Sequence, residues 1–351
     1  MLLAQPGSGD EPHSRMDRES REAPEVLRRQ QDMLARPIAE LAAALRQKPP
    51  RVIVTCARGS SAHAATFGKH LIERRIGIPV AAAAPGIASL YRQPLHLGGQ
   101  VLIAISQAGR SDDIIETARM ARSSGALTVG IVNDVASPLA QACEIVLPMG
   151  AGPERSIAAT KSFVASLAVL VRLVASWSDD LAMQRALDRL AVRVHAATDL
   201  DWSAALGSLA AANSAMTIGR GPTLAIAREA SLKLKEGCGL HAEPFSSAEF
   251  QHGPIALVGD AYPIIAFRPT DAAATGLEQL VQRLSRAGAA VFSTGPTIHG
   301  ATPLPALEPD HPDVDPICLI QTFYQLLIAI AERRGGNVDN PRHLQKVTQT
   351  R

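Results

Sequence analysis

The strongest constraint in the sequence is the alternation of short apolar runs with helical stretches. RVIVTC (51–56) precedes the polar loop ARGSS and a helical stretch over 62–75, and VLIAIS (101–106) precedes a second polar loop and a helical stretch over 112–125. ALTVGIV (126–132) is the next apolar run. Strands that are apolar throughout are buried on both faces, and strands joined through helices run parallel. The pattern predicts an α/β fold with a parallel sheet covered by helices on both faces.

The second half of the chain repeats this arrangement. AMTIGRG (215–221) and a helical stretch over 222–236 match the first unit, and YPIIAF (262–267) followed by AAVFSTG (289–295) matches the second. Aligning Val54 with Ile218 gives an offset of 164 (218 minus 54), and aligning Gly125 with Gly288 gives 163 (288 minus 125). We infer an internal duplication of one doubly wound domain. Chance similarity between two α/β domains is the alternative, because such units are built alike.

The predicted division has five parts. Residues 1–22 form a disordered tail, in which Met1 and Met16 are alternative natural starts, and 23–48 form an N-terminal helix ended by two prolines. Two α/β domains follow over 49–195 and 196–337, with a long helical stretch over 161–212 at the join, and a C-terminal tail occupies 338–351. The apolar stretches 162–177 and 316–332 each contain Arg or Gln. Both are shorter than the run of about 20 apolar residues that a membrane-spanning helix needs. They are predicted to be buried helices, with no membrane span.

Composition excludes several classes of protein. Hydrophobic residues at 46% and charged residues at 19% are typical of globular chains and exclude a wholly disordered one. A net charge of +2 and 3% aromatic residues argue against nucleic acid as a partner. Cys56, Cys143, Cys238 and Cys318 lie far apart without a C-x-x-C pair, which argues against a zinc ribbon, a redox motif or disulfides. With no signal-peptide pattern at the N-terminus, a reducing cytoplasm fits best.

Two loops that follow apolar runs are rich in serine. Ligands of open α/β sheets bind beyond the carboxyl ends of the strands. The segment from Ser106 to Ser111 offers hydroxyls, a glycine, Arg110 and the free N–H groups of a helix start, which is the composition of a phosphate cradle. The alternative is that Ser111 only caps the following helix. Gly59-Ser60-Ser61, placed in the same way after RVIVTC, favours the cradle.

A third segment, over 230–254, contains side chains that are candidates for acid–base catalysis. Lys233 and Glu236 share a helix face, and His241, Glu243, Glu249 and His252 follow in a loop broken by Gly and Pro. The spacings match no established metal site, so no metal is predicted. The alternatives to a functional role are a solvated helix face for Lys233 and Glu236 and a packed loop residue for His252. For Lys346, near the C-terminus, the alternative is a frayed end.

Six ordered motifs carry a family resemblance: CARGSSAHA, ISQAGRSDD, ERSIAATKSF, IGRGPTLAIAREASLKLKE, HAEPFSSAEFQHGP and DNPRHLQKVT. From about residue 30 to the end, the chain resembles the sugar isomerase (SIS) double domain of glucosamine-6-phosphate synthase. The resemblance implies two tandem doubly wound SIS domains, flavodoxin-like three-layer αβα, with an N-terminal helix and a C-terminal tail. About 50 residues without cysteine precede the first strand, so no glutaminase activity is expected.

The resemblance also assigns roles to residues. Glu236 would be the base that moves a proton between C1 and C2, His252 would assist ring opening from the neighbouring subunit, Lys346 would close over the sugar, and Lys233 would support charge near Glu236. The sugar phosphate would be bound by Ser60, Ser61, Ser106, Gln107, Arg110, Ser111 and Ile157. A homodimer with shared active sites is implied, and no cofactor. The loop has Ala108 and the IAATK motif has Ala159 where the synthase usually has serine, and Arg110 supplies a compensating charge.

The loop G-R-S and the tail look more like stand-alone SIS glucosamine-6-phosphate deaminases. The leading hypothesis is therefore conversion of glucosamine 6-phosphate to fructose 6-phosphate and ammonia. A second enzyme hypothesis is a fructosamine-6-phosphate deglycase or another phosphosugar isomerase. A third, from another class, is a non-catalytic phosphosugar sensor, although no helix-turn-helix module precedes the domains.

Overall fold

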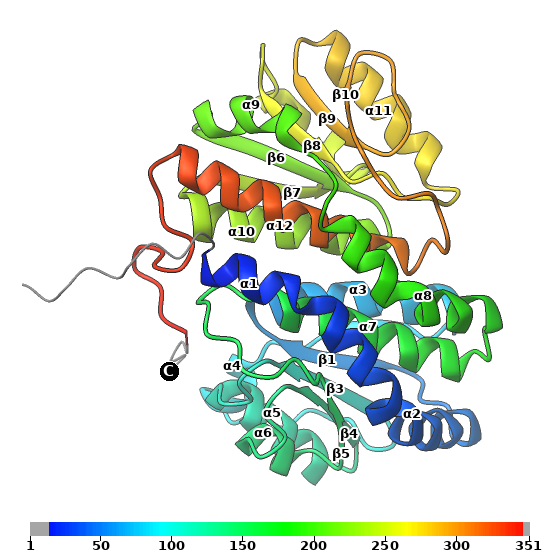
Figure 1. Cartoon of the computed structure of the whole chain (residues 1–351). Helices are drawn as coiled ribbons and strands as arrows, with labels where there is room; N and C mark the ends of the chain where they lie inside the picture. The colour runs from blue at the N-terminus through cyan, green and yellow to red at the C-terminus, as the bar shows by residue number, and fades with distance from the viewer. Residues whose placement is uncertain (1–13, 347–351) are drawn as a thin grey trace, which may run out of the picture.

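The computed structural model describes residues 14–346. Two five-stranded sheets lie at opposite ends of the molecule, with helices between them and on their outer faces (Figure 1). The strand order is β2-β1-β3-β4-β5 in the first sheet and β7-β6-β8-β9-β10 in the second, and every pairing is parallel. This is the flavodoxin-like order, so the predicted fold of two tandem doubly wound domains is confirmed.

The first half contains the strands β1 (Ile53–Ala57), β2 (Val80–Ala82), β3 (Val101–Ser106), β4 (Leu127–Val132) and β5 (Ile145–Pro148). Its helices, including those that lead into the second half, are α1 (Arg15–Arg21), α2 (Ala23–Gln47), α3 (Gly59–Arg75), α4 (Gly86–Ser89), α5 (Asp112–Ser123), α6 (Pro138–Ala142), α7 (Lys161–Trp177), α8 (Leu181–Ala197), the 3-10 helix η1 (Ser203–Ala205) and α9 (Leu206–Ala211).

The second half contains the strands β6 (Ser214–Gly219), β7 (His241–Ser246), β8 (Pro263–Ala266), β9 (Ala290–Thr294) and β10 (Thr302–Leu304). Its helices are α10 (Pro222–Cys238), η2 (Glu249–Gln251), η3 (Pro254–Leu257), α11 (Ala274–Arg286) and α12 (Asp315–Arg333).

The largest core lies between the two sheets. Helices α2, α7, α8, α10 and α12 bury their apolar faces there against side chains from both sheets, such as Ile103 and Ile265. Smaller clusters fill the outer faces, under α5 and α6 on the first sheet and under α11 on the second. Each sheet is therefore covered on both sides, which explains why its central strands are apolar throughout.

The two halves share more than strand order. Val54 lies in β1 and Ile218 in the equivalent strand β6, as the predicted alignment requires. Gly125 and Gly288 both have positive φ, 80° and 89°, at the turn that leads into β4 and β9. A residue with a Cβ is strained in that region, so the turn favours glycine at both positions. These matches support the inferred duplication.

The prediction of a disordered tail over residues 1–22 is wrong in part. Residues 1–13 lie outside the described chain, but Arg15–Arg21 forms helix α1, whose Met16 and Ser20 are fully buried. Ser14 is the N-cap residue of this helix, and its hydroxyl accepts a hydrogen bond from the N–H of Asp17. A polar heptapeptide such as RMDRESR gives no apolar stripe, and it is ordered here because its few buried groups pack against α12 and α7.

Two further elements differ from the sequence predictions. Ser60 and Ser61 lie in the first turn of α3 and not in a loop, because Gly59 takes a positive φ of 53° that starts the helix earlier. The segment predicted as a broken loop begins with a strand, β7, which contains His241 and Glu243. Pro244 is tolerated there because β7 lies at the edge of its sheet.

The helical stretch predicted over 161–212 is divided into α7, α8, η1 and α9. The buried helices predicted over 162–177 and 316–332 correspond to α7 and α12. None of the helices in the described part of the chain is long and apolar enough to cross a membrane. All four cysteines are free and buried, and burial raises the pKa of Cys56, Cys238 and Cys318 to about 12.

Ion pairs join the two halves at the end of α3. Asp313, fully buried, accepts hydrogen bonds from Arg74 and Arg75, and Arg74 also pairs with Asp271. The Arg75 Nε to Asp313 Oδ2 distance is 2.6 Å. A buried carboxylate is stable only while such partners remain in place.

We expect Asp313→Asn to lower the apparent free energy of unfolding in urea by about 3 kcal/mol, because two partly buried guanidinium groups lose their shared partner. The matched control is Asp179→Asn, which breaks the exposed pair with Arg46 and should cost less than about 0.5 kcal/mol. Equal effects of the two variants would contradict a special role for Asp313.

Candidate functional site

A pocket of about 360 Å³ lies where the carboxyl ends of β1 and β3 meet helix α10 and the C-terminal tail. We call it the serine pocket. Its walls are Arg58, Gly59, Ser60, Ser61, Ser106, Gln107, Ala108, Arg110, Ser111, Ile157, Ala159, Lys233, Glu236, Leu344, Gln345 and Lys346. All seven residues predicted to bind substrate line it, together with three of the four predicted catalytic residues.

The first turn of α3 supplies one side of the serine pocket. Ser60 and Ser61 are half-buried there, at a helix start with no side-chain cap. The backbone N–H groups of a first helical turn have no partner within the helix, and the helix dipole is positive at that end. This side of the pocket therefore favours an anionic group.

The loop between β3 and α5 supplies the opposite side. The hydroxyl of Ser106 accepts a hydrogen bond of 3.1 Å from the N–H of Gly109, which holds the loop in a tight turn. Gly109 has φ 64°, and a Cβ there would lie 2.1 Å from Ser137 Oγ. Ser111 is the N-cap residue of α5 but its side chain makes no capping bond, so its hydroxyl remains available to a ligand.

Two arginines flank this loop. Arg110 is exposed and pairs with Asp134 at 3.2 Å. Arg58 pairs at 2.6 Å with Asp113, which is almost fully buried in the first turn of α5. The second pair ties the α3 side of the pocket to the α5 side, and it was not predicted from the sequence.

Helix α10 carries the most buried charge of the pocket. Lys233 is 1% exposed, and its Nζ lies 3.0 Å from Ser60 Oγ, 2.7 Å from Glu236 Oε2 and 3.2 Å from Glu229 Oε1. The alternative of an ordinary solvated helix face therefore does not hold for Lys233. Glu236, whose side chain is 22% exposed, is the most exposed member of this group and lines the pocket together with Lys233.

Glu229, four residues before Lys233 on α10, forms a charged cluster with Lys233 and Glu236. It is fully buried, and its Oε2 lies 2.8 Å from Nδ1 of His63 on α3. Burial alone would raise the pKa of Glu229, but Lys233 and His63 outweigh burial and lower it. Burial likewise opposes the charge of Lys233, and the carboxylates of Glu229 and Glu236 raise its pKa in spite of this. The cluster thus holds its charges by mutual pairing.

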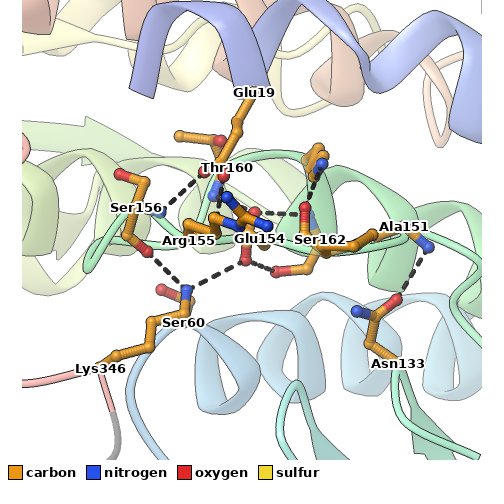
Figure 2. Close-up of polar contacts among 12 residues, drawn as sticks. Glu19, Ser60, Asn133, Ala151, Glu154, Arg155, Ser156, Thr160, Ser162 and Lys346 are labelled. Atoms are coloured by element: carbon orange, nitrogen blue, oxygen red, sulfur yellow. Dashed lines mark hydrogen bonds and ion pairs between the residues drawn. The ribbon is translucent and has the colours of Figure 1, made fainter. Parts of the chain in front are cut away.

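The loop over 153–160 contributes Ile157 to the wall of the pocket. Figure 2 shows polar contacts of this loop. The Nζ of Lys346 in the C-terminal tail donates to the carbonyl oxygen of Ser156 at 2.6 Å and lies 3.6 Å from Oε2 of the buried Glu154. The tail is thus docked against the pocket, which is the placement predicted for Lys346.

His252 lies elsewhere. It ends the short helix η2, is exposed, and does not line the serine pocket of its own chain. Within residues 14–346, no group of three or more His, Cys, Asp or Glu side chains is arranged to hold a metal ion.

Several residues of the site were missed from the sequence: Arg58, His63, Glu154 and Glu229. Glu229 precedes Lys233 by four residues on one helix, a spacing that signals an ion pair. No comparable signal marks His63, because its partner comes from the other half of the chain.

Comparison with known proteins gives a consistent result. A family model described as SIS domain matches residues 45–176 and 208–295. The glutamine–fructose-6-phosphate aminotransferase (isomerizing) of Zymomonas mobilis is 31% identical over 314 residues, which are 84% of this chain and 51% of that protein. The chain therefore spans about half the length of the curated relatives it matches.

Two solved structures are also similar. A provisionally assigned phosphosugar isomerase from Silicibacter pomeroyi DSS-3 is 40% identical, with a TM-score of 0.89 over 93% of this chain and all of that one. The C-terminal domain of the glucosamine-fructose-6-phosphate aminotransferase from Francisella tularensis is 25% identical, with a TM-score of 0.82 over 93% of this chain and 98% of that one.

We expect Lys233→Met to lower the apparent free energy of unfolding at pH 7 by about 3–5 kcal/mol, because the variant leaves the carboxylate of Glu229 buried without its main partner. Lys235→Met, two residues along the same helix at an exposed position, is the control and should cost less than about 1 kcal/mol.

The cost of Lys233→Met should depend on pH. In the wild type, the lowered pKa of Glu229 gives stability that is present above its ordinary pKa of 4.5 and lost as pH falls through the folded-state pKa. In the variant, burial raises that pKa, so acid removes the unpaired charge. Urea denaturation from pH 7 to pH 3 should show the difference between the two proteins shrinking, and a constant difference would contradict this account.

Proposed function

The chain belongs to the SIS domain family, and from this membership we propose that it is a phosphosugar isomerase that converts glucosamine 6-phosphate to fructose 6-phosphate and ammonia. The observation that carries the proposal is the position of Glu236. Its carboxylate lies at the wall of a serine-lined pocket, held at 2.7 Å by a buried lysine that also bonds to Ser60. A fixed carboxylate beside an anion-binding loop suits proton transfer on a sugar phosphate.

Serine side chains at the starts of α3 and α5 and at the end of β3 would bind the phosphate. Ser61, Ser106 and Ser111 bring hydroxyl groups to one pocket, and the first turn of α3 adds unpaired N–H groups. A phosphate held at that end of the pocket leaves the other end of an open-chain sugar for Glu236, Lys233 and Lys346.

The proposed reaction starts from the open-chain aldehyde. Glu236 removes the proton at C2, which the adjacent carbonyl acidifies, and the proton is returned at C1. The C1 oxygen gains a proton as the amine nitrogen loses one, so the aldehyde becomes a hydroxyl group and the bond between C2 and nitrogen becomes an imine. Water then adds to C2, and ammonia leaves. Glucosamine 6-phosphate and water thus give fructose 6-phosphate and ammonia without an oxidant or reductant. Lys233 holds the carboxylate in place, and Lys346 closes the pocket above the sugar.

Ring opening would need a second copy of the chain. His252 is exposed and outside the serine pocket of its own chain, so we propose that a homodimer brings it to the pocket of the partner. We place this homodimer in the cytoplasm, in keeping with four buried free thiols.

A fructosamine-6-phosphate deglycase, which would use the same base on a different amine, is the alternative enzyme. A phosphosugar sensor without catalysis is the alternative from another class.

The first test is ammonia release and fructose 6-phosphate formation from glucosamine 6-phosphate, without added metal or glutamine. Glu236→Gln should lower the rate by about 10²–10⁴, because it removes the base. Glu116→Gln, at an exposed position on α5, should leave the rate unchanged. Turnover of fructosamine 6-phosphates alone would favour the deglycase, and phosphosugar binding without turnover would favour the sensor.

Mixed dimers test the shared site. Glu236→Gln and His252→Asn should each be nearly inactive as homodimers. After unfolding and refolding together in equal amounts, about a quarter of the sites should regain both intact residues, because half of the dimers are mixed and each has one intact site. No recovery, in dimers whose mixing is confirmed by mass, would contradict the sharing of His252.

A further inference from the structure

Three segments that are far apart in the sequence meet at the loop over 153–160: helix α1, the loop itself and the C-terminal tail. Figure 2 shows Glu19 reaching the loop from one side and Lys346 from the other, with Ser156 and Glu154 between them. The loop carries Ile157 and Ala159 into the wall of the serine pocket. Whatever fixes its shape therefore affects both the pocket and the tail.

Glu19 binds the backbone of this loop directly. One oxygen of its carboxylate accepts from the N–H of Arg155 at 2.5 Å, and the other accepts from the N–H of Ser156 at 2.9 Å. Glu19 is 6% exposed and Ser156 is fully buried. Hydrogen bonds from backbone N–H groups to a carboxylate are stronger than bonds between neutral groups, and here two of them converge on one side chain.

Lys346 binds the opposite side of the same residue. The N–H of Ser156 points to Glu19, while its carbonyl oxygen accepts from Nζ of Lys346 at 2.6 Å. Glu154 holds the rest of the loop, because its buried carboxylate accepts from the N–H groups of Thr160 and Ser162 at 3.0 and 3.1 Å. The carbonyl that Lys346 uses is therefore placed by Glu19 acting through a single residue.

The tail is attached to α1 at a second point. The carboxylate of Asp339 accepts from the N–H groups of Arg15 and Met16 at 2.6 and 2.9 Å, which satisfies two donors at the start of α1. Helix α1 thus contacts the tail through its first turn and the loop through Glu19. The helix, the loop and the tail form a closed ring of contacts beside the pocket.

We propose that Glu19 is a positioning residue for Lys346: it fixes the backbone N–H of Ser156, the residue whose carbonyl oxygen the tail lysine binds, and α1 and the tail act as one unit at the serine pocket. The part of this inference that concerns turnover rests on the proposed function, because it takes Lys346 as a group that acts on the sugar. The part that concerns the docking of Lys346 does not.

The charge of Glu19 is essential to this role. Both of its oxygens face N–H donors, and a carboxylate has acceptors only. In Glu19→Gln, the side-chain NH₂ group replaces one acceptor and faces a donor, so one of the two bonds is lost with little change in volume. The variant therefore loosens the loop while keeping the size of the side chain.

Amine labelling measures the docking of Lys346 directly. The wild type and its variants would be treated with limiting N-hydroxysuccinimide acetate, and acetylation of Lys346 followed by mass spectrometry relative to the exposed Lys48. We expect Glu19→Gln to label Lys346 at least about fivefold faster, the change that corresponds to one hydrogen bond of ordinary strength.

The matched control is Ser20→Ala on the same helix. Ser20 is buried, as Glu19 is, but its hydroxyl bonds to the carbonyl of Asp17 and to Gln325 on α12, away from the loop. It should change stability without changing the labelling of Lys346 by more than about twofold. Labelling in Glu19→Gln that matches the wild type, or that Ser20→Ala reproduces, would overturn the proposal.

Asp339→Ala is a second variant for the case in which Glu19→Gln does not fold. It removes the contact between the tail and α1 and leaves Glu19 intact, so it should also speed the labelling of Lys346. Unchanged labelling in this variant would overturn the coupling between helix and tail.

Kinetics separate positioning from a general loss of structure. Glu19→Gln should lower kcat while KM stays within about twofold, because the serine side chains that hold the phosphate are not altered. In a Lys346→Met background it should lower kcat no further, since the lysine it positions is absent. Additive effects would overturn the proposal. Absence of any turnover in the wild type would sink the proposed function and leave the labelling result as the test of Glu19.

Discussion

The site depends on the pairing of the buried Lys233 ammonium group with its neighbours. A lysine loses its water when it is buried, and only a full set of partners offsets that loss. Those partners come from two helices: Glu229 and Glu236 from α10, and Ser60 from the first turn of α3. The two helices belong to different halves of the chain. The need to satisfy one charge thus helps to hold α3 of one half against α10 of the other, and the serine pocket lies at that junction.

Much of this could be predicted from the sequence, because the signals were local. Apolar runs predicted the central strands, and the serine-rich segments predicted two walls of the pocket. What was missed depends on tertiary partners. Glu19 lies in a polar stretch with no periodicity, and its role comes from N–H groups more than 130 residues away. The edge strand β7 was missed because its Gly and Pro neighbours indicate a loop, and pairing with β6 overrides that preference.

The duplicated halves have diverged at the corresponding edge. In the first half, the carboxyl ends of the strands face an open pocket with hydroxyl groups and a carboxylate. In the second half, the end of α3 is bound by Asp271 and Asp313, and Arg268 is engaged by Glu278. A cavity of about 430 Å³ remains there, walled largely by prolines and other apolar groups. The serine pocket therefore combines the serine-rich segments of the first copy with helix α10 of the second.

The contact between Asp339 and the start of α1 has a consequence for folding. It joins groups 324 residues apart in sequence, and the bond from Lys346 to Ser156 spans 190 residues. Closing a long loop costs little more than closing a medium one, but contacts of such separation form late. While the protein is being synthesised, both sheets have all their strands before the tail leaves the ribosome. During synthesis, the tail can therefore complete the pocket only after both sheets have had the chance to pair their strands.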